Sequence, residues 1–285
     1  LVSEGERKPG DRLEFARWLV DGKNPLVARV VVNRFWQSYF GQGLVSTSDD
    51  FGSQGAPATH PELLDWLATE FVDSGWDMKY LNRLIVTSAV YRQGAKMSSQ
   101  LRERDPKNRL LSRMPRVRLP AEQIRDQALV IGGLLKSFPG GPSVFPLQPQ
   151  NYWEDRDLPG KWKAGSGDDL HRKSLYTYWR RMALHPTMEL LDAPARAACV
   201  SRRNSANLPT QALVTLNAPV FVESAEGLAK RLLGEALDSK GRLDLAFRLC
   251  LGRLPDADER EKFLSFLEHS HRLENSHRQL IRIPL

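Results

Sequence analysis

The chain has 285 residues, of which 41% are hydrophobic and 26% are charged, and it carries a net charge of +7. This composition is typical of a folded globular protein and excludes a fibrous or intrinsically disordered chain. No apolar run reaches the about 18 residues that a membrane-spanning helix needs. The longest candidate, 26–36, is interrupted at Arg29, Asn33 and Arg34. The chain begins at Leu1 without a leader sequence, so we expect a segment of a longer protein.

Basic residues outnumber acidic residues by 41 to 34 and form short clusters at 113–118 and 202–203. We interpret the excess as spread along a solvated surface with internal ion pairs. A nucleic-acid-binding surface usually has a denser basic stripe or a known motif, and the sequence has neither a zinc-finger spacing nor an aromatic RNA-binding motif. Nucleic acid is therefore the least favoured partner.

Helical periodicity covers most of the chain and predicts a mainly α, multi-helix globular domain. Asp11 and Asp77 precede apolar runs and are typical N-caps. Pro25 should begin another helix, which Gly41 ends. The sequence Thr59-His-Pro-Glu has the form of a capping box, with Thr59 as the N-cap. The predicted helices are 12–20, 25–40, 60–74, 78–89, 120–135, 209–217, 219–237, 243–251 and 257–268.

Apolar positions within these helices predict which faces are buried. We expect Leu13, Phe15 and Trp18 to bury the first helix, and the helix from Pro25 to be buried almost all round. The helix from Pro120 should bury a stripe that consists of Ala121, Ile124, Ala128, Ile131 and Leu135.

The segment 138–169 lacks periodicity and is rich in proline, glycine and tryptophan. We predict that it is a long irregular segment that joins two helical halves, 11–135 and 172–270, of a single domain spanning 1–285. The alternation in 174–179 predicts one short strand, which would be at most a minor β element. Long irregular segments often carry binding residues.

The helix from Pro25 places Arg29 and Asn33 on one stripe, and Asp49, Asp50 and Asp65 could reach Arg29. One interpretation is an internal ion-pair network that joins this helix to the helix after His60. The other is a pocket for an anion or a sugar, built from Arg29, Asn33 and His60. We expect Arg29, on this buried helix, to pair with an acid of the region 49–65, so that Arg29→Ala costs about 3–5 kcal/mol because it leaves a buried carboxylate unpaired.

A second charged group comprises Glu122, Arg125 and Asp126. Two carboxylates could perform acid–base chemistry on a glycoside. Neighbours one turn apart on a helix are more often a surface salt-bridge group, which is the interpretation we favour.

A ligand, if one binds, should contact the irregular segment through Trp153 and Trp162, since aromatic rings offer flat apolar area with a polar tip. Arg180 and Arg203 should then face the same cleft. The alternative is that the two rings fill a gap between the helical halves.

The sequence gives no metal site and no cofactor site. Cys199 and Cys250 are the only cysteines, and neither belongs to a C-x-x-C or C-x-x-C-H motif. They could pair in an oxidising compartment or remain as two thiols. No phosphate-binding loop, zinc-binding H-E-x-x-H or nucleophile elbow is present.

Several long stretches resemble one known family. They are NPLVARVVVNRFWQSYFGQGLVSTSDDFGSQGAPATHPELLDWLATEF, GWDMKYLNRLIVTSAVYRQ, DPKNRLLSRMPRVRLPAEQIRDQAL, RKSLYTYWRR, LLDAPARAACVSRRNSANLPTQALVTLNAPVF and LAFRLCLGRLPDADE. Together they make 11–268 similar to the planctomycete secreted domain family, a domain of unknown function, although the tail 276–285 departs from the expected ending. Matching positions are Arg29, Asn33, Arg34, Trp36, Asp50, Gly52, His60, Pro61, Asp65, Glu122, Arg125, Asp126, Arg180, Asp192, Arg203, Gln211 and Asn217.

The resemblance implies context and no activity. Family members resemble one another as C-terminal regions of large exported proteins, behind a cytochrome-like domain, and some have a haem-binding segment further upstream. It therefore implies an exported, periplasmic or cell-envelope location, with other domains of the same protein as partners. We hypothesise a non-catalytic binding or assembly module, with a polysaccharide or an envelope protein as a candidate partner. The alternative is an envelope hydrolase acting on a sugar or a sulfated polymer, with His60 or the group of Glu122 and Asp126 as acid–base residues.

Overall fold

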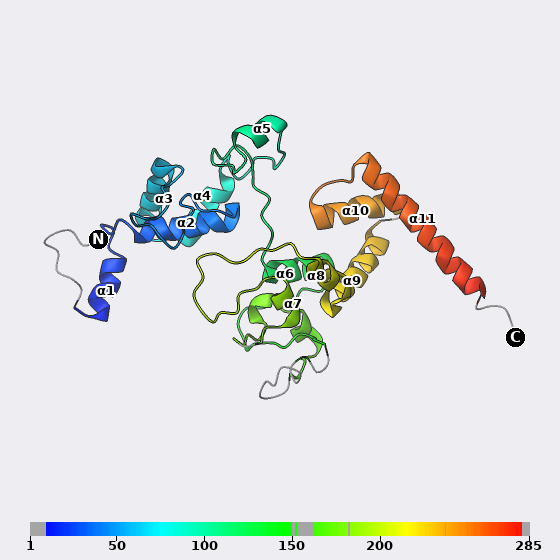
Figure 1. Cartoon of the computed structure of the whole chain (residues 1–285). Coiled ribbons are helices and arrows are strands. Elements are labelled where there is room, and N and C mark those ends of the chain that lie inside the picture. Colours follow the sequence, from blue (N-terminus) through cyan, green and yellow to red (C-terminus); the bar gives the residue numbers. More distant parts are fainter. Residues whose placement is uncertain (1–9, 150–151, 153–161, 182, 237, 281–285) are drawn as a thin grey trace. The chain divides into compact units, whose positions relative to one another are not determined.

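The computed structural model describes residues 10–149, 152, 162–181, 183–236 and 238–280, and it confirms the prediction of a mainly α fold (Figure 1). Within these residues the β contacts are isolated bridges and not strands. The α-helices are α1 (Arg12–Leu19), α2 (Val27–Phe40), α3 (Pro61–Asp73), α4 (Met78–Thr87), α5 (Ser99–Arg104), α6 (Ala121–Ile131), α7 (Pro186–Leu190), α8 (Pro209–Asn217), α9 (Pro219–Glu235), α10 (Ser239–Leu251) and α11 (Ala257–Leu280).

The chain divides into two compact units. Unit 1 comprises Leu1–Arg118 and Val200–Arg202, and unit 2 comprises Leu119–Cys199 and Arg203–Leu285. The division lies just before α6, so the irregular segment 138–169 belongs to unit 2 as a whole.

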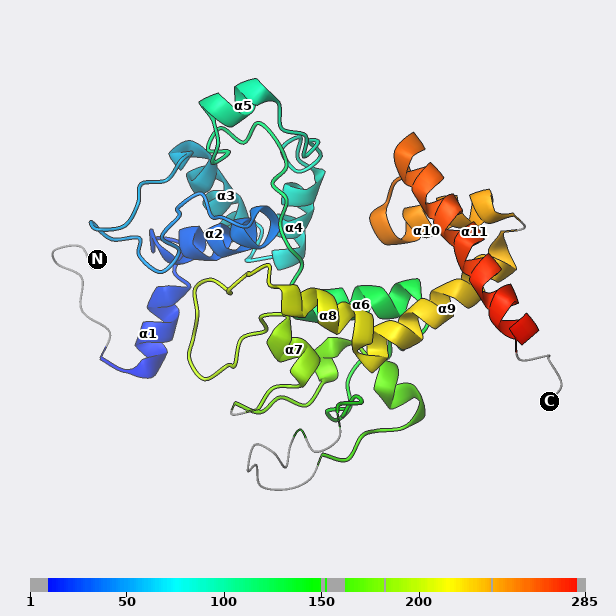
Figure 2. The same ribbon diagram turned by 45° about the vertical axis from the view of Figure 1, so that its right-hand side comes forward.

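The core of unit 1 is built by α2, α3 and α4, which lie against one another (Figure 2). Val32, Trp36 and Phe40 of α2 are buried, and the rings of Trp36 and Phe40 stack at 4.3 Å. The other side of α2 is only partly buried and Arg34 is exposed, so the helix is less enclosed than its apolar composition predicts.

The predicted helix ends are mostly confirmed. The Asp11 carboxylate accepts a hydrogen bond from the Glu14 amide, and the Asp77 carboxylate caps α4 in the same way. Gly41 ends α2 with a φ of 74°, in the left-handed region that glycine adopts without strain. The capping box at Thr59 is wrong, because His60 is the N-cap of α3 and the Thr59 hydroxyl instead donates to the carbonyl of Leu44.

The predicted burial of α1 is also wrong. Leu13 and Phe15 are about half exposed, and no residue of α1 is buried. The helix is held through its own N-cap and a stacked contact between Phe15 and Trp18 at 5.9 Å. Periodicity thus identified a helix here but not a buried one.

In unit 2, the end of α6 and the helix α9 approach so closely that glycine is required at Gly132, directly after α6, and at Gly227 on α9. A Cβ on Gly132 would lie 2.7 Å from the carbonyl oxygen of Ser224, and a Cβ on Gly227 would lie 2.2 Å from that of Gly132. Helix α6 ends at Ile131, four residues before Leu135, because two glycines follow it. Its buried positions are Ala121, Arg125 and Leu129, so the buried face includes a charge. Of the predicted stripe, Ala121 is buried, and Ile124 and Ala128 are partly buried against the same core.

The predicted strand at 174–179 is wrong. Ser174–Tyr176 forms a short 3-10 helix, and Thr177 makes one parallel bridge with Val144. Through this bridge the segment after residue 138 runs alongside 176–178, with two backbone hydrogen bonds of 2.8 Å at Val144. Within the described residues, side chains also hold the irregular segment: Arg172 donates to the carbonyl of Pro142, the Gly140 amide donates to the Tyr176 hydroxyl, and His185 bonds to the carbonyl of Leu147.

Candidate functional site

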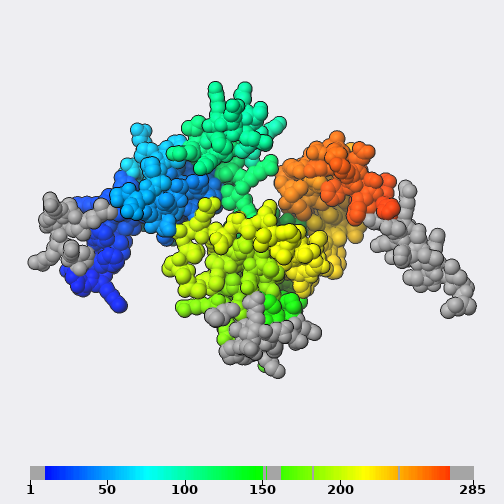
Figure 3. Space-filling model, in the orientation of Figure 1, coloured from blue at the N-terminus to red at the C-terminus, as the bar shows by residue number. Residues whose placement is uncertain are grey.

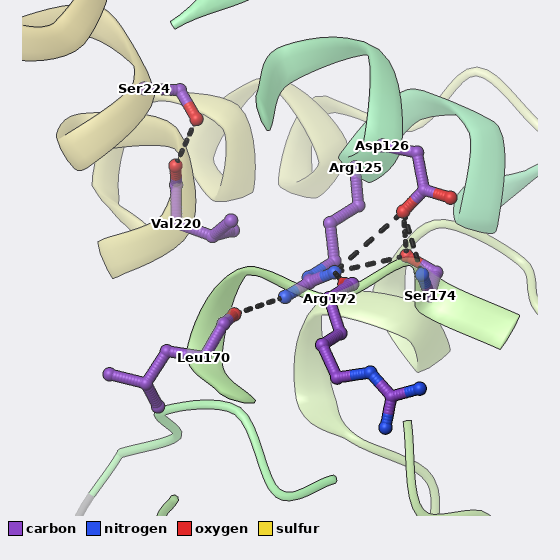
Figure 4. A network of polar contacts seen from close by, with 7 residues as sticks. All are labelled: Arg125, Asp126, Leu170, Arg172, Ser174, Val220 and Ser224. Carbon is purple, nitrogen blue, oxygen red and sulfur yellow. Dashed lines mark hydrogen bonds and ion pairs between the residues drawn. The ribbon is translucent and has the colours of Figure 1, made fainter. Parts of the chain in front are cut away.

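The centre of unit 2 contains a buried guanidinium, that of Arg125 on α6, which is 1% exposed (Figure 4). It donates to the carbonyls of Arg172 at 2.9 Å and Leu170 at 2.7 Å, and to the Ser174 hydroxyl at 3.3 Å. Burial lowers the pKa of Arg125, while the charges of Asp126 and Glu223 act in the opposite direction. Arg125 thus clamps the segment 170–174 onto α6.

Asp126 supports the same segment from the next position of α6. Its Oδ1 accepts from the amide and the hydroxyl of Ser174, both at 2.7 Å, and lies 3.7 Å from Nη1 of Arg125. The side chain of Arg172 turns away from this centre, as Figure 4 shows, and its guanidinium lies 3.9 Å from the centre of the Tyr176 ring. The hydrogen bonds of Arg125 and Asp126 thus go to groups of the protein itself, and they hold segment 170–174 against α6.

A buried histidine, His185, lies on the same side of unit 2, at the N-cap of α7. Its Nε2 is 2.9 Å from the carbonyl oxygen of Leu147, and its Nδ1 is buried and has no hydrogen-bond partner among the described residues. Burial, together with the nearby charge of Arg125, lowers the pKa of His185 to about 4. The imidazole is therefore neutral near pH 7.

His185 and Arg125 line one small pocket, which we call the His185 pocket. Its walls are formed by Arg125, Pro146, Leu147, Leu170, His185, Val220 and Glu223. The Nε of Arg125 is also buried and without an acceptor within the part of the chain that the structure describes. The Glu223 carboxylate lies 3.1 Å from Nε2 of His171. The Glu223 side chain is 38% exposed, so one wall of the pocket reaches solvent.

Aromatic rings from the irregular segment adjoin His185. The Trp162 ring is centred 5.8 Å from the imidazole and 5.0 Å from the ring of Phe145, which stacks on Tyr178 at 4.8 Å. The Trp162 indole N–H donates to the carbonyl of Pro146 at 3.0 Å, and the side chain is partly exposed. Of the two predicted contact tryptophans, Trp162 thus lies beside the His185 pocket, and Trp153 lies outside the described residues.

The other predicted residues of unit 2 lie in separate arrangements. Glu122 accepts from Arg203 at 2.8 Å, in a pair in which the Arg203 side chain is 45% exposed. Arg180 is partly exposed and forms an isolated bridge with Ala183. The interpretation of Glu122, Arg125 and Asp126 as one surface group is wrong for Arg125, which is buried, whereas Glu122 does belong to a salt bridge.

In unit 1, Arg29 is paired with Asp65, as one of the two interpretations predicts. The Nε of Arg29 lies 2.5 Å from Oδ1 of Asp65, but the two side chains are 34% and 52% exposed. This contact lowers the pKa of Asp65, mainly through the hydrogen bond from Arg29. The expected cost of about 3–5 kcal/mol for Arg29→Ala is therefore wrong, because an exposed pair contributes about 0–1 kcal/mol.

The remaining polar residues of unit 1 have local partners. Asn33 is fully buried and forms a two-way amide contact with Val45, at 2.9 and 3.0 Å. Asp50 accepts from the amide of Gly52 at 2.8 Å, which is a turn contact. His60 is partly buried, with Nδ1 3.1 Å from the Thr59 hydroxyl. These contacts favour a structural role over the alternative of an anion or sugar pocket.

Sequence reasoning missed His171, His185 and Glu223. The dipeptide His185-Pro186 has the same form as His60-Pro61, where a histidine precedes a helix that begins with proline. The second pair is the weaker signal, because α7 has five residues whereas α3 has 13. The partners of these residues come from distant positions in the chain, which periodicity does not reveal.

No group of three or more His, Cys, Asp or Glu side chains in the described residues is arranged to hold a metal ion. Cys199 and Cys250 are free thiols, the first of them exposed. None of the helices in the described part of the chain is both long and apolar enough to cross a membrane.

Comparison with known proteins confirms the family resemblance. A family model described as PSD1, protein of unknown function (DUF1553), matches residues 11–267. No curated protein and no solved structure matches the chain. The family match covers both compact units.

Proposed function

Because the chain belongs to the PSD1 family of proteins of unknown function, we propose a function from its own site: it is a non-catalytic binding module, and the His185 pocket binds a hydroxyl group of a neutral ligand. The observation that carries this proposal is the buried Nδ1 of His185, which has no partner among the described residues. A buried polar atom without a partner costs free energy, and a bound group that donates a hydrogen bond to it would remove that cost.

The hydrogen bond at Nε2 identifies the chemistry at Nδ1. A backbone carbonyl can only accept, so the contact with Leu147 requires the proton of the neutral imidazole to be on Nε2. Nδ1 then carries a lone pair and accepts hydrogen bonds. A ligand that satisfies it must supply an O–H or N–H group.

The other polar groups of the pocket favour a neutral hydroxyl. The unpartnered N–H at Nε of Arg125 is a donor, and the carboxylate of Glu223 is an acceptor. A hydroxyl group both donates and accepts, so it can satisfy both kinds of partner. An anion would face the Nδ1 lone pair and the Glu223 carboxylate, and the two terminal nitrogens of Arg125 are already bonded to the protein.

The rings beside His185 support a sugar as the source of that hydroxyl. Trp162 is partly exposed and lies within stacking distance of the imidazole and of Phe145. Aromatic faces bind the apolar faces of pyranose rings, while hydroxyl groups project towards polar partners. The candidate ligand is therefore a neutral oligosaccharide or polysaccharide.

A hydrolase remains the second candidate, and the geometry favours it less. A glycosidase commonly uses two carboxyl groups on either side of the scissile bond. Among the described residues that line the His185 pocket, Glu223 is the single carboxylate. The carboxylates of Glu122 and Asp126, which the sequence suggested, are bonded to Arg203 and Ser174.

The context of this module follows from the family resemblance. We propose that the chain belongs to an exported or cell-envelope protein, that other domains of that protein are its partners, and that any haem is bound by another segment. The complete gene tests this context directly. A leader sequence and an upstream C-x-x-C-H motif would support it, and a cytoplasmic protein without either would contradict it.

Calorimetric titration of the full chain with neutral oligosaccharides, and in parallel with sulfated and carboxylated ones, tests the proposed function. We expect neutral sugars to bind and His185→Gln to abolish binding. Glutamine can place its amide nitrogen near the position of Nε2 and retain the bond to Leu147, but it has no acceptor at the position of Nδ1. Trp162→Ala should weaken binding by about tenfold, the equivalent of one base or sugar stacking contact.

Trp66→Ala is the matched control, because Trp66 is a 48% exposed tryptophan of unit 1. It should leave sugar affinity unchanged. The proposal is refuted if no neutral sugar binds, or if sugars bind equally well to wild type, His185→Gln and Trp162→Ala. Binding of anionic sugars alone would refute the assignment of a neutral ligand.

A further inference from the structure

A second candidate interaction surface lies in unit 1, on residues 96–118, which we call the basic loop. Eight of these residues are Lys or Arg and two are acidic, so the segment carries a net charge of +6, compared with +7 for the whole chain. This corrects our interpretation of the basic excess as spread along the chain. The excess is local, and it belongs to one surface segment.

Most of this charge is exposed and uncompensated. The exposed basic side chains are Lys96, Arg102, Arg104, Lys107, Arg109 and Arg116. No ion pair between these six and an acidic side chain occurs in the described part of the chain. Unpaired surface charges of one sign attract an oppositely charged surface over about 10 Å at moderate ionic strength.

Two buried charged residues bridge the part of the basic loop from 105 to 113. Asp105 and Arg113 are 5% and 6% exposed. The Asp105 carboxylate accepts from the amides of Arg109 at 2.7 Å and Leu110 at 2.9 Å, and Arg113 donates to the carbonyls of Asp105 and Pro106. These internal hydrogen bonds give the loop a defined fold. A run of charges that only keeps a surface solvated would not need them.

The ordered loop presents an apolar side chain among the basic ones. Leu110 is 71% exposed, directly after Arg109. In the space-filling view of Figure 3, side chains around α5 project from the surface of unit 1. An exposed leucine fixed between unpaired cations combines the two features by which peripheral proteins bind acidic lipid surfaces, electrostatic attraction and insertion of an apolar group.

Other anionic partners fit the basic loop less well. Residues 92–137 contain no Phe, Tyr or Trp, so the loop offers no ring on which a base or a sugar could stack. Its one helix, α5, has six residues, which is too short to read a DNA groove. We propose that the basic loop binds the surface of a membrane that contains anionic lipid, with Leu110 inserted between headgroups.

Sedimentation of the full chain with vesicles of phosphatidylcholine, with and without phosphatidylglycerol, tests this proposal. We expect binding to the anionic vesicles alone, and we expect it to fall steeply as salt is added. Lys107→Gln should weaken binding about fivefold, and Lys107→Gln combined with Arg109→Gln about 25-fold, because each cation near an anionic surface contributes a similar increment. Leu110→Gln should weaken it by a further severalfold.

Two matched controls are available on the same chain. Lys79→Gln removes an exposed charge of α4, outside the basic loop, and Leu216→Gln replaces a leucine that is also 71% exposed, in unit 2. Both should bind vesicles as wild type does. Equal binding to neutral vesicles overturns the proposal, and so does binding to DNA or polyglutamate without binding to vesicles. A vesicle affinity that Leu110→Gln leaves unchanged also overturns it, because the contact would then be with charge alone.

Discussion

Arg125 should be among the most costly side chains of unit 2 to remove. In Arg125→Met, an apolar side chain of similar length replaces a guanidinium that bonds two carbonyls and a hydroxyl. Each lost hydrogen bond to the charged guanidinium costs about 1.5–3 kcal/mol of stability. Removing the buried charge also removes its desolvation penalty, which offsets part of this loss. The expected net loss in the free energy of unfolding is about 3–5 kcal/mol.

Urea denaturation, followed by circular dichroism for wild type and variant, measures this loss. Arg29→Met is the matched control, because it makes the same substitution at an arginine whose side chain is 34% exposed. It should cost about 0–1 kcal/mol, since its pair with Asp65 is solvated. If Arg125→Met costs less than about 1 kcal/mol, or no more than Arg29→Met, the account of Arg125 as the clamp of segment 170–174 is refuted.

Three further predictions concern stability. The folded-state pKa of His185, about 4, lies below its ordinary value of 6.5, so the unfolded chain binds the proton more tightly. Unfolding titrations should therefore show stability falling by roughly 3 kcal/mol as pH drops from about 6.5 through about 4, with much less of this fall in His185→Gln. Gly227→Ala should lower the melting temperature, because its Cβ would lie 2.2 Å from a backbone oxygen of α6, whereas Gly234→Ala on the same helix has open space and should raise it slightly. Asn33→Leu should destabilise unit 1 by about 2–4 kcal/mol in urea titrations, because it leaves the buried amide and carbonyl of Val45 without partners, and a loss below about 1 kcal/mol would contradict that role.

The helices of this protein could be predicted from sequence because their signals are local. Asp11 and Asp77 cap helices within three residues, and Gly41 and Gly75 adopt left-handed conformations where a helix must stop. Burial depends on partners that the sequence does not identify. The apolar face of α1 remains exposed for this reason, and Thr59 bonds to Leu44 instead of capping α3.

The candidate site was harder to predict, because its side chains also depend on partners far away in the sequence. Arg125 was identified as part of a charged group, yet its burial depends on carbonyls about 45 residues further along the chain. His185 precedes a proline as His60 does, but its bond to Leu147 and its contact with Trp162 join irregular segments that periodicity does not reveal. Trp162 could be selected because an aromatic ring in an aperiodic segment is itself an unusual feature.

The most direct test of the proposed binding function measures which imidazole nitrogen of His185 carries the proton, and whether a ligand changes the signal of the other nitrogen. Long-range ¹H–¹⁵N spectra of the full chain, labelled at histidine, resolve the two imidazole nitrogens. At pH 7 the account predicts a proton on Nε2 and an unprotonated Nδ1, whose resonance shifts when a neutral oligosaccharide is added and stays in place when a sulfated one is added. A proton on Nδ1, or a resonance that no neutral sugar moves at millimolar concentration, would contradict the proposal that this atom receives the ligand.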